Sequence, residues 1–259
     1  MKRDFDLIAK PYRWLEYLTF GLALTRCRNH FLPALADRRR ALIVGDGDGR
    51  FTARLLASNP QLEAQAVDLS PVMLALLTRR VAAAHPTART RLRTHPADAR
   101  TFVPTGPYDL VVTHFFLDCL TQHELDSFAF CLRPHLTPNA LWLVSDFRIP
   151  AGFMRLPARF LVRSLYFGFR ILTRLRTTGL PNHAAALASV GLICTAQHLS
   201  LGGLLTSQLW SRIINGDLHL HDPTGVISVH ATTAAKASDP TPARPSARSR
   251  TRQPLASRA

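Results

Sequence analysis

Residues 41–50 read Ala41-Leu42-Ile43-Val44-Gly45-Asp46-Gly47-Asp48-Gly49-Arg50. The four apolar residues that open this stretch predict a short buried strand, and three glycines at alternate positions then end it. Residues 50–58 predict a helix, because Phe51, Leu55 and Leu56 are spaced to share one face. In open α/β sheets, a strand, a glycine-rich turn and a helix in this order build a nucleotide site, since glycines allow a tight turn and the close approach of a ligand.

The spacing of the glycines narrows the kind of ligand. A dinucleotide-binding turn has the pattern G-x-G-x-x-G, and here Arg50 stands where the third glycine belongs. Asp46 and Asp48 would oppose a phosphate, because they bring negative charge to the helix N-terminus that attracts the anion. The pattern therefore favours a cationic ligand without phosphate, such as S-adenosylmethionine. A tight turn that binds nothing is the alternative.

A further acidic residue follows the next predicted strand, residues 61–67. Asp68 lies about 20 residues beyond the glycines, where a carboxylate in such folds meets the hydroxyls of a ribose. A carboxylate accepts two hydrogen bonds at once, which suits a vicinal diol. Asp68 also fits the N-terminal cap of a helix that begins at Ser70 and Pro71, and the two roles are compatible.

These motifs resemble those of the class I S-adenosylmethionine-dependent methyltransferases. The resemblance rests on residues 42–50, 67–74 and 97–99, extends over roughly 5–215, and is strongest for the ubiquinone/menaquinone C-methyltransferase-like branch. It implies S-adenosylmethionine as the cofactor, bound by Gly45, Asp46, Gly47, Asp48, Gly49, Asp68, Leu69, Met73, Asp98, Ala99 and His114. One departure is Ile43, because the family usually has an acidic residue there that helps to hold the methionine ammonium. Asp46 or Asp48 is the candidate replacement.

The remaining pattern predicts an α/β fold of three layers. We expect a Rossmann-like sheet of seven strands, mostly parallel with an antiparallel last strand, together with N-terminal helices and a helical lid insertion after the fifth strand. The expected strands are 41–44, 61–67, 89–95, 108–113, 141–144, 192–199 and 205–214, and the expected helices include 22–35, 50–58, 71–84, 121–132 and 183–190. In the helix 71–84, Val72, Leu76 and Val81 are expected to face inward.

The organisation along the chain follows from these elements. Residues 1–36 are expected to form a helical cover, and residues 37–222 the methyltransferase domain, with the lid at 148–181. Residues 223–259 lose the apolar pattern and read as a disordered basic tail. The four cysteines are scattered, which argues against a zinc site and a disulfide scaffold. No metal is expected.

Candidate catalytic residues follow the strand 108–113. His114 and Asp118 are expected near the reactive methyl group, because ligands bind beyond the carboxyl ends of strands. His114 is the predicted base, since an unperturbed imidazole has a pKa near neutrality, and Asp118 or Asp146 could orient it. The alternative for His114 is a hydrogen-bonded loop residue, and the alternative for Asp118 is a cap for the helix 121–132. The predicted substrate residues are Tyr12, Tyr17 and Arg148, although both tyrosines also fit as packing residues.

The charge of the chain favours anionic partners. It has 32 Lys and Arg against 17 Asp and Glu, for a net charge of +15. General arginine enrichment would give the same excess. Within 155–174, a basic helix face is formed by Arg155, Arg159, Arg163, Arg170 and Arg174. We expect this face to contact an anionic membrane surface, with a solvated lid as the alternative.

Three functions are compatible with these features. The first is methyl transfer to a small, lipophilic acceptor, such as a quinone or an aromatic ring methylated at carbon or hydroxyl. The second is a phospholipid or nucleic-acid methyltransferase; residues 114–117 lack the N/D-P-P-Y/F motif typical of amine-methylating nucleic-acid enzymes, so no specific nucleic acid is expected. The third is a non-catalytic binding protein of the same fold. We expect a cytoplasmic protein, peripheral on the inner membrane face, because neither a signal peptide nor a spanning run is present. The sequence leaves the oligomeric state open.

Overall fold

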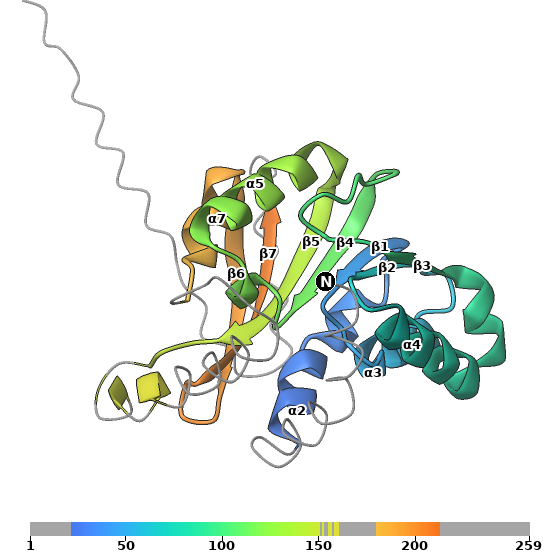
Figure 1. Ribbon diagram of the computed structural model, residues 1–259, viewed down its shortest axis with the longest axis horizontal. Helices are drawn as coiled ribbons and strands as arrows, with labels where there is room; N and C mark the ends of the chain where they lie inside the picture. Colours follow the sequence, from blue (N-terminus) through green and yellow to red (C-terminus); the bar gives the residue numbers. More distant parts are fainter. Residues whose placement is uncertain (1–21, 151, 153–154, 157, 161–179, 213–259) are drawn as a thin grey trace, which may run out of the picture. The chain divides into compact units, whose positions relative to one another are not determined.

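The computed structural model describes residues 22–150, 152, 155–156, 158–160 and 180–212 (Figure 1). The chain divides into two units, 1–229 and 230–259, and everything below belongs to the first. The predicted substrate residues Tyr12 and Tyr17, most of the arginine face and the predicted tail lie outside the described residues.

The described residues form one seven-stranded sheet with the order β3-β2-β1-β4-β5-β7-β6. Strands β1 to β5 run parallel, and β7 lies between β5 and β6, antiparallel to both. The predicted α/β fold with an antiparallel last strand is therefore confirmed. The strands are β1 (Arg40–Val44), β2 (Glu63–Asp68), β3 (Leu92–Pro96), β4 (Tyr108–His114), β5 (Leu136–Phe147), β6 (Leu192–Ser200) and β7 (Leu205–Arg212).

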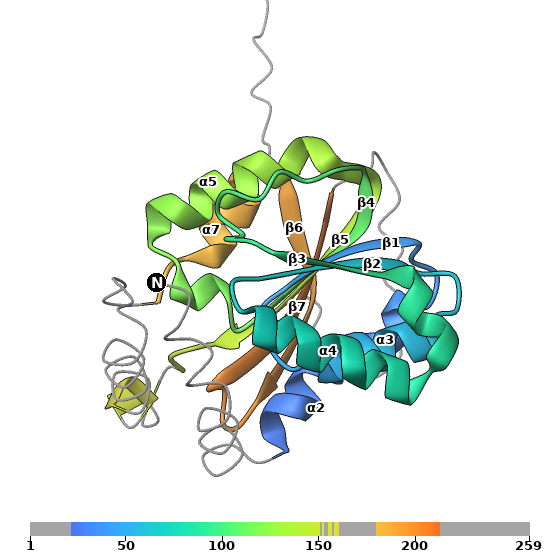
Figure 2. The ribbon, with the colours of Figure 1, turned by 45° about the vertical axis from the view of Figure 1, so that its right-hand side comes forward.

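Helices cover both faces of the sheet and complete the three layers (Figure 2). One face packs against α3 (Arg50–Ser58) and α4 (Pro71–Ala84), and the other against α5 (Gln122–Leu132) and α7 (His183–Ser189). Strands β1 and β4 are apolar on both faces, as a central parallel strand between two helical layers requires. Short 3-10 turns are η1 (Leu32–Leu35), η2 (Pro86–Arg91), η3 (Leu117–Cys119) and η4 (Arg133–His135).

The strand order reverses direction between β1 and β4. The chain builds outward from β1 to β3 and then returns to add β4 on the other side of β1. Val44 pairs with Thr113 in the register, so the loops that follow the two strands leave the sheet side by side. In open α/β folds, this reversal leaves a crevice beyond the carboxyl ends of the strands, and ligands bind there.

A further helix, α2 (Ala23–Asn29), lies along the same edge of the sheet. It contacts β6, β7 and α3, and Figures 1 and 2 both show it beside the turn that joins β6 to β7. The predicted continuous helix over 22–35 is wrong, because α2 ends at Asn29 and a 3-10 turn follows. Pro33 explains the break, since proline has no N–H to donate within a helix.

Three other predictions differ from the structure in detail. The third strand begins at Leu92 rather than at 89, because Pro86 opens the turn η2, and the fifth strand extends over Leu136–Phe147. In α4 the buried residues are Leu74, Leu77 and Val81, whereas Val72 is 39% exposed. Leu77 sets this orientation, because it packs directly against the glycine turn after β1. No helix among the described residues is long and apolar enough to cross a membrane.

Candidate functional site

The glycine turn after β1 combines tight packing with one open position. Gly45, Gly47 and Gly49 all have positive φ angles, of 81°, 60° and 80°. A Cβ on Gly45 would lie 2.7 Å from the carbonyl oxygen of His114, and one on Gly49 would lie 2.5 Å from Cγ of Leu77. A Cβ on Gly47 would meet no atom of the described residues within 4 Å. Two glycines therefore let the turn pack against β4 and α4, and the third leaves bare backbone facing open space.

Asp46 is directed back into the protein. Its side chain is 3% exposed, and its oxygens accept from the N–H of Phe51 at 3.3 Å and from the N–H and hydroxyl of Thr52 at 2.8 and 2.6 Å. It therefore caps the N-terminus of α3, whose first amides have no partner within the helix. Burial raises the pKa of Asp46, and the hydrogen bonds from Thr52 together with the charge of Arg28 oppose that rise.

Asp48 is held by two arginines. Its carboxylate lies 3.2 Å from Nε of Arg50 and 2.9 Å from a terminal guanidinium nitrogen of Arg80. Nε of Arg80 also donates to the Asp48 carbonyl. These contacts fasten the turn to α4 and balance the charge of Asp48. The sequence favoured a cationic ligand because Asp46 and Asp48 add negative charge to the turn. That argument is weaker in the structure, because two arginines already pair with Asp48. The role of either aspartate toward a methionine ammonium stays a prediction.

Asp68 lies at the tip of β2, next to this turn. One carboxylate oxygen accepts from the N–H of Ser70 at 2.8 Å, and the Ser70 hydroxyl accepts from the N–H of Met73 at 3.2 Å. Ser70, rather than Asp68, is thus the cap of α4. Asp68 and Met73 are half-buried and Leu69 is exposed, so the predicted cofactor residues of this strand remain accessible.

Asp98 belongs to the loop after β3, which hydrogen bonds to the end of β2 through the Ala97 N–H and the Asp68 carbonyl at 3.1 Å. Its carboxylate pairs with Arg100, whose guanidinium nitrogen lies 2.6 Å away, and this pairing lowers the pKa of Asp98. Arg100 also binds Glu124 at the start of α5. Ala99 is buried. The structure brings these residues beyond the carboxyl ends of β2 and β3, and Asp98 already pairs with Arg100 there.

His114 ends β4 inside the protein. The ring is completely buried and meets Phe51 of α3 edge to face, with the ring centroids 4.5 Å apart. Neither ring nitrogen has a hydrogen-bond partner among the described residues. Burial lowers the pKa of His114 well below its usual value, and Arg28 adds to this effect. The reason for choosing His114 as a base, an ordinary pKa near neutrality, is therefore wrong, although its role itself stays a prediction.

Asp118 and Asp146 form a buried pair beyond the ends of β4 and β5. Asp146 accepts from the N–H of Asp118 at 3.2 Å and from the N–H of Phe147 at 2.8 Å. Burial and the neighbouring Asp118 carboxyl raise the pKa of Asp146 well above its usual value. The alternative interpretation of Asp118 as the cap of α5 is wrong, because Thr121 caps that helix in a capping box with Glu124.

Arg28 is a residue of this region that the sequence did not single out. It is only 7% exposed, and its guanidinium lies 5.0 Å from the centre of the Phe115 ring, directly after β4. Its charge acts on the pKa values of both Asp46 and His114. A charged residue in a short amphipathic helix normally faces solvent, so the sequence contained no feature that would have identified it.

Arg148 follows β5 and lies at the β6–β7 turn. Its backbone N–H donates to the Leu204 carbonyl at 2.7 Å, and its guanidinium lies within 3.4 Å of the position that a Cβ on Gly203 would take. Its predicted contact with the substrate is untested. Among the described residues, no group of three or more histidine, cysteine or acidic side chains could hold a metal ion.

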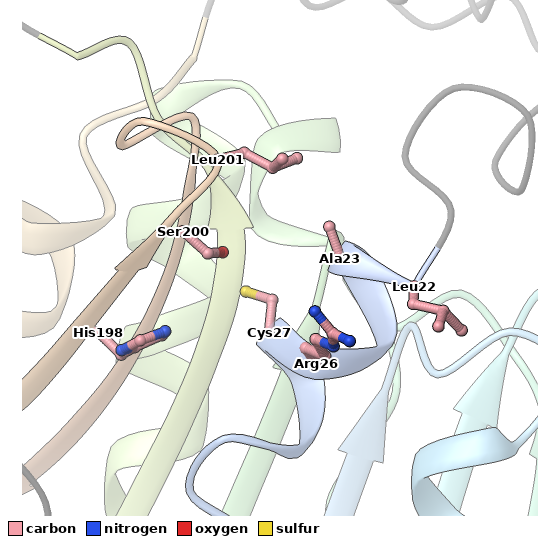
Figure 3. Close-up of a pocket in the computed structure, with 7 residues that line it drawn as sticks. All are labelled: Leu22, Ala23, Arg26, Cys27, His198, Ser200 and Leu201. Carbon is pink, nitrogen blue, oxygen red and sulfur yellow. The ribbon is translucent and has the colours of Figure 1, made fainter.

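A cavity of about 520 Å³ lies between α2 and the end of β6 (Figure 3). The α2 side contributes Leu22, Ala23, Arg26 and Cys27, and the β6 side contributes His198, Ser200 and Leu201. Its size is within the range of small-molecule pockets.

Comparisons with known proteins agree with this fold. Residues 42–142, less than half of the chain, match the family described as a methyltransferase domain. No curated protein sequence matches the chain significantly. Solved structures share its fold at low sequence identity. The mitomycin 7-O-methyltransferase MmcR is 18% identical with a TM-score of 0.55, over 74% of this chain and 55% of that one.

Two further structures have similar scores. The N,N-8-amino-8-demethyl-D-riboflavin dimethyltransferase RosA from Streptomyces davawensis is 19% identical with a TM-score of 0.54, over 81% of this chain and 62% of that one. The N-methyltransferase NodS from Bradyrhizobium japonicum WM9 is 14% identical with a TM-score of 0.52, over 73% of this chain and 96% of that one. The chain therefore spans less than two thirds of the length of the first two.

Residues 42–142 thus match a methyltransferase domain, and the sheet has the fold of solved methyltransferases, in agreement with the fold that the resemblance implied. They do not separate the quinone C-methyltransferase-like branch from the others. The three similar structures are named for methyl transfer to oxygen or to nitrogen, so this fold by itself does not fix the acceptor atom.

Proposed function

We propose that the protein binds S-adenosylmethionine in the crevice beyond β1, β2 and β4 and transfers its methyl group to a small, lipophilic acceptor. A quinone or an aromatic ring, methylated at carbon or hydroxyl, is the favoured class. The observation that supports this most directly is Gly47, whose backbone faces open space between two glycines that are needed for packing. Its place in the turn beyond β1, where a ligand can approach the backbone, is what sets Gly47 apart from other open glycines with positive φ.

The residues around the crevice fit this cofactor. Asp68 would hold the ribose hydroxyls. The N–H of Ser70 donates to one of its carboxylate oxygens and orients the side chain, which is half-buried at the tip of β2. Leu69 and Met73 would contact the adenine. Arg28 would face the methionine carboxylate from α2. When bound, the cofactor supplies an electrophilic methyl group, and the contribution of these residues is to orient it.

Replacing Gly47 tests the open position. Gly47→Ala adds a methyl group that clashes with no atom of the described residues, so the stability of this variant should fall only by the cost of a left-handed alanine. Its affinity for S-adenosylmethionine, measured by calorimetry, should fall at least about tenfold, because the ligand loses its close approach to the backbone. Gly191→Ala is the matched control, since Gly191 also has a positive φ and open surroundings but lies after α7. Equal affinities in the two variants would contradict the proposed site.

Replacing Asp68 tests the ribose contact. Asp68→Ala should weaken cofactor binding by the loss of two charge-assisted hydrogen bonds, each worth roughly 1.5–3 kcal/mol. Asp126→Ala removes an exposed carboxylate from α5 and serves as the control. Unchanged affinity in Asp68→Ala would remove Asp68 from the site. A protein that shows no binding of S-adenosylmethionine at all would instead favour the non-catalytic alternative.

The acceptor class calls for a separate experiment. Host extracts are incubated with the protein and isotopically labelled S-adenosylmethionine, and the labelled products are identified by mass spectrometry. Labelled quinones or aromatic compounds would support the favoured class and, for methylation at ring carbon, the quinone branch. Label in phospholipid or nucleic acid would favour the second alternative from the sequence.

We also propose that the segment around 155–160 contacts an anionic membrane surface. Among the described residues here, Leu156 and Phe160 are 75% and 77% exposed, and Arg155 and Arg159 are exposed beside them. Exposed apolar and basic residues on one segment suit the interface of an anionic bilayer. The protein should sediment with anionic vesicles more than with neutral ones. Arg155→Ala/Arg159→Ala should lose this preference, whereas the exposed pair Arg54→Ala/Arg79→Ala should keep it.

A further inference from the structure

The turn between β6 and β7 exposes a leucine in a strained backbone conformation. Leu201 has a φ of 49°, and its side chain is 45% exposed. A bulky residue with positive φ is unusual, because glycine or asparagine normally takes such a position. Leu201 thus brings both backbone strain and apolar exposure to the tip of the turn. Strain that is kept at an exposed position points to a function other than the folding of the turn itself.

Exposed apolar side chains of other segments surround this turn. Leu22 and Leu201 both line the cavity between α2 and β6 (Figure 3), and Ala158 packs with Leu204 in one apolar cluster. Six of the ten large apolar residues that are exposed in the described part of the chain belong to these segments. We call them the apolar rim: Leu22, Ile149, Leu156, Phe160, Leu199 and Leu201.

The segments that form the apolar rim are basic. Asp and Glu are absent from their sequences, residues 22–30, 147–160 and 180–212. Arg26 is exposed at the cavity, and the guanidinium of Arg148 lies within 3.4 Å of the position that a Cβ on Gly203 would take. Exposed leucines among arginines suit an anionic bilayer, where apolar side chains enter the acyl region and arginines meet lipid phosphates. A second copy of the chain would instead bring its own arginines to this surface.

The apolar rim lies at the same edge of the sheet as the crevice. The backbone N–H of Arg148 donates to the Leu204 carbonyl at 2.7 Å, so the turn lies directly beyond the carboxyl end of β5. Strand β5 pairs with β4, and Phe115, which follows β4, packs in one cluster with Leu205 at the start of β7. A bilayer against the apolar rim would therefore lie at the edge of the sheet where the proposed cofactor crevice opens.

We infer that the β6–β7 turn inserts into an anionic lipid bilayer, with Leu201 at its tip, and holds the crevice edge of the sheet against the membrane. The acceptor then reaches the crevice from the bilayer, as a lipophilic compound dissolved in it. This second part rests on the proposed methyl transfer, whereas the insertion of the turn does not. The inference goes beyond the contact proposed for residues 155–160, because it adds an apolar insertion and an orientation.

The first test separates membrane binding from folding. Leu201→Asn should unfold at the same urea concentration as the wild type or at a higher one, since asparagine adopts a positive φ more readily than leucine. Its binding to vesicles of phosphatidylglycerol and phosphatidylcholine in equal parts should be about tenfold weaker in cosedimentation, because one leucine side chain is no longer buried in lipid. Phe130→Asn removes a side chain that is 67% exposed near the end of α5, at the opposite edge of the sheet, and should leave vesicle binding unchanged.

A second variant reports the insertion directly. Leu201→Trp places an indole at the tip of the turn, and phospholipids brominated along their acyl chains should quench its fluorescence. The quenching is measured relative to the wild type, because the chain already contains three tryptophans. Phe130→Trp should add no quenching.

The insertion is overturned if Leu201→Asn binds the vesicles as tightly as the wild type, or if Leu201→Trp is not quenched. Loss of binding in Arg155→Ala/Arg159→Ala alone would then assign the membrane contact to residues 155–160. A wild type that dimerises, does not bind vesicles and becomes monomeric in Leu201→Asn would also overturn it, in favour of an interface between copies.

The source of the acceptor is tested with labelled S-adenosylmethionine and separated membrane and soluble fractions of the host. Label should enter lipophilic compounds of the membrane fraction, and less of it in Leu201→Asn. Label confined to the soluble fraction would overturn this second part. Affinity for S-adenosylmethionine, measured without vesicles, should be equal in both proteins. Lost vesicle binding with normal cofactor binding leaves the proposed function in place, whereas a wild type that binds vesicles but no cofactor refutes that function and keeps the insertion.

Discussion

The two parts of the sheet edge differ in how closely they are packed. Around β1 to β3, the carboxylates of Asp46, Asp48 and Asp98 all have partners inside the protein. Around α2 and β6, a cavity of about 520 Å³ separates the two elements. The match to the methyltransferase domain also ends at residue 142, before β6 and β7 begin.

This difference corresponds to two kinds of binding task. On the proposed function, the cofactor is the same for every enzyme of the class, so its side of the edge can be prebuilt and rigid. The acceptor differs from enzyme to enzyme, so we expect the part of the edge that receives it to keep open space. The first side should therefore be sensitive to changes in packing, and the second to changes in ligand contact.

The largest loss of stability is expected from Gly49→Ala, in the turn after β1. Its Cβ would lie 2.6 Å from Cα of Leu77, which is backbone and cannot move aside, and φ is +80°. The free energy of unfolding, from urea denaturation, should fall by about 3–5 kcal/mol. Gly191→Ala has a similar φ and open surroundings, and should lose only about 1 kcal/mol. Similar losses in both variants would mean that packing at the turn is not rigid.

The second largest loss of stability is expected at the buried carboxyl pair Asp118 and Asp146, which lies beyond the ends of β4 and β5. Asp146→Ala removes the carboxylate that accepts from the N–H groups of Asp118 and Phe147, and the free energy of unfolding, from urea denaturation, should fall by about 2–4 kcal/mol. Asp146→Asn keeps an acceptor and should cost less.

The same pair predicts a pH dependence. Because the folded pKa of Asp146 is raised, its stabilising contribution is complete below the unfolded value near 3.8 and is lost as the pH rises through the folded pKa. Asp146→Asn should lack this part of the profile of unfolding free energy against pH. A profile identical to that of the wild type would show that the pKa of Asp146 is not raised in the folded protein.

A smaller effect is expected from His114, at the boundary of the crevice. Its folded pKa lies well below the usual 6.5, so the unfolded chain takes up the proton first as the pH falls. Stability should decrease below about pH 6.5, by at most about 1.4 kcal/mol per pH unit from this one residue. His114→Leu should show a correspondingly shallower loss between pH 6.5 and 5. Were the slopes equal, the ring would have to be protonated already in the folded protein.

The smallest effect is expected from the ion pair that ties the turn to α4. Arg80 is 37% exposed, and exposed pairs contribute roughly 0.2–1 kcal/mol. Arg80→Ala should lose no more than this in urea denaturation, less at high salt, while the exposed Arg79→Ala should be neutral. A loss above about 2 kcal/mol would mean that the turn depends on its charges as well as on its glycines.

The sequence predicted the fold well because the fold depends on local patterns. The strand, glycine turn and helix at 40–58 could be identified from apolar spacing alone, and the structure has them within one residue. For α4 the sequence placed Val81 inward correctly but Val72 wrongly, because the contact of Leu77 with Gly49, which orients the helix, joins elements that are distant in the sequence.

The site was less predictable, since it depends on which groups pair in space. The sequence shows that Asp46 stands between two glycines, but not that Thr52 and Phe51 occupy its oxygens. It shows His114 after a strand, but not that the ring is buried against α3. The burial of Arg28 depends on where α2 packs, which no local pattern encodes.

The place of β7 in the sheet has a consequence for how the chain matures during synthesis. Because β7 lies between β5 and β6, the outer side of β5 has no strand beside it until residues 205–212 have left the ribosome. Up to that moment a growing chain presents the bare backbone of β5, twelve residues long, to its neighbours. Premature termination before Leu205 should therefore yield chains that associate through this strand, and the β6–β7 hairpin acts as the closing step of assembly.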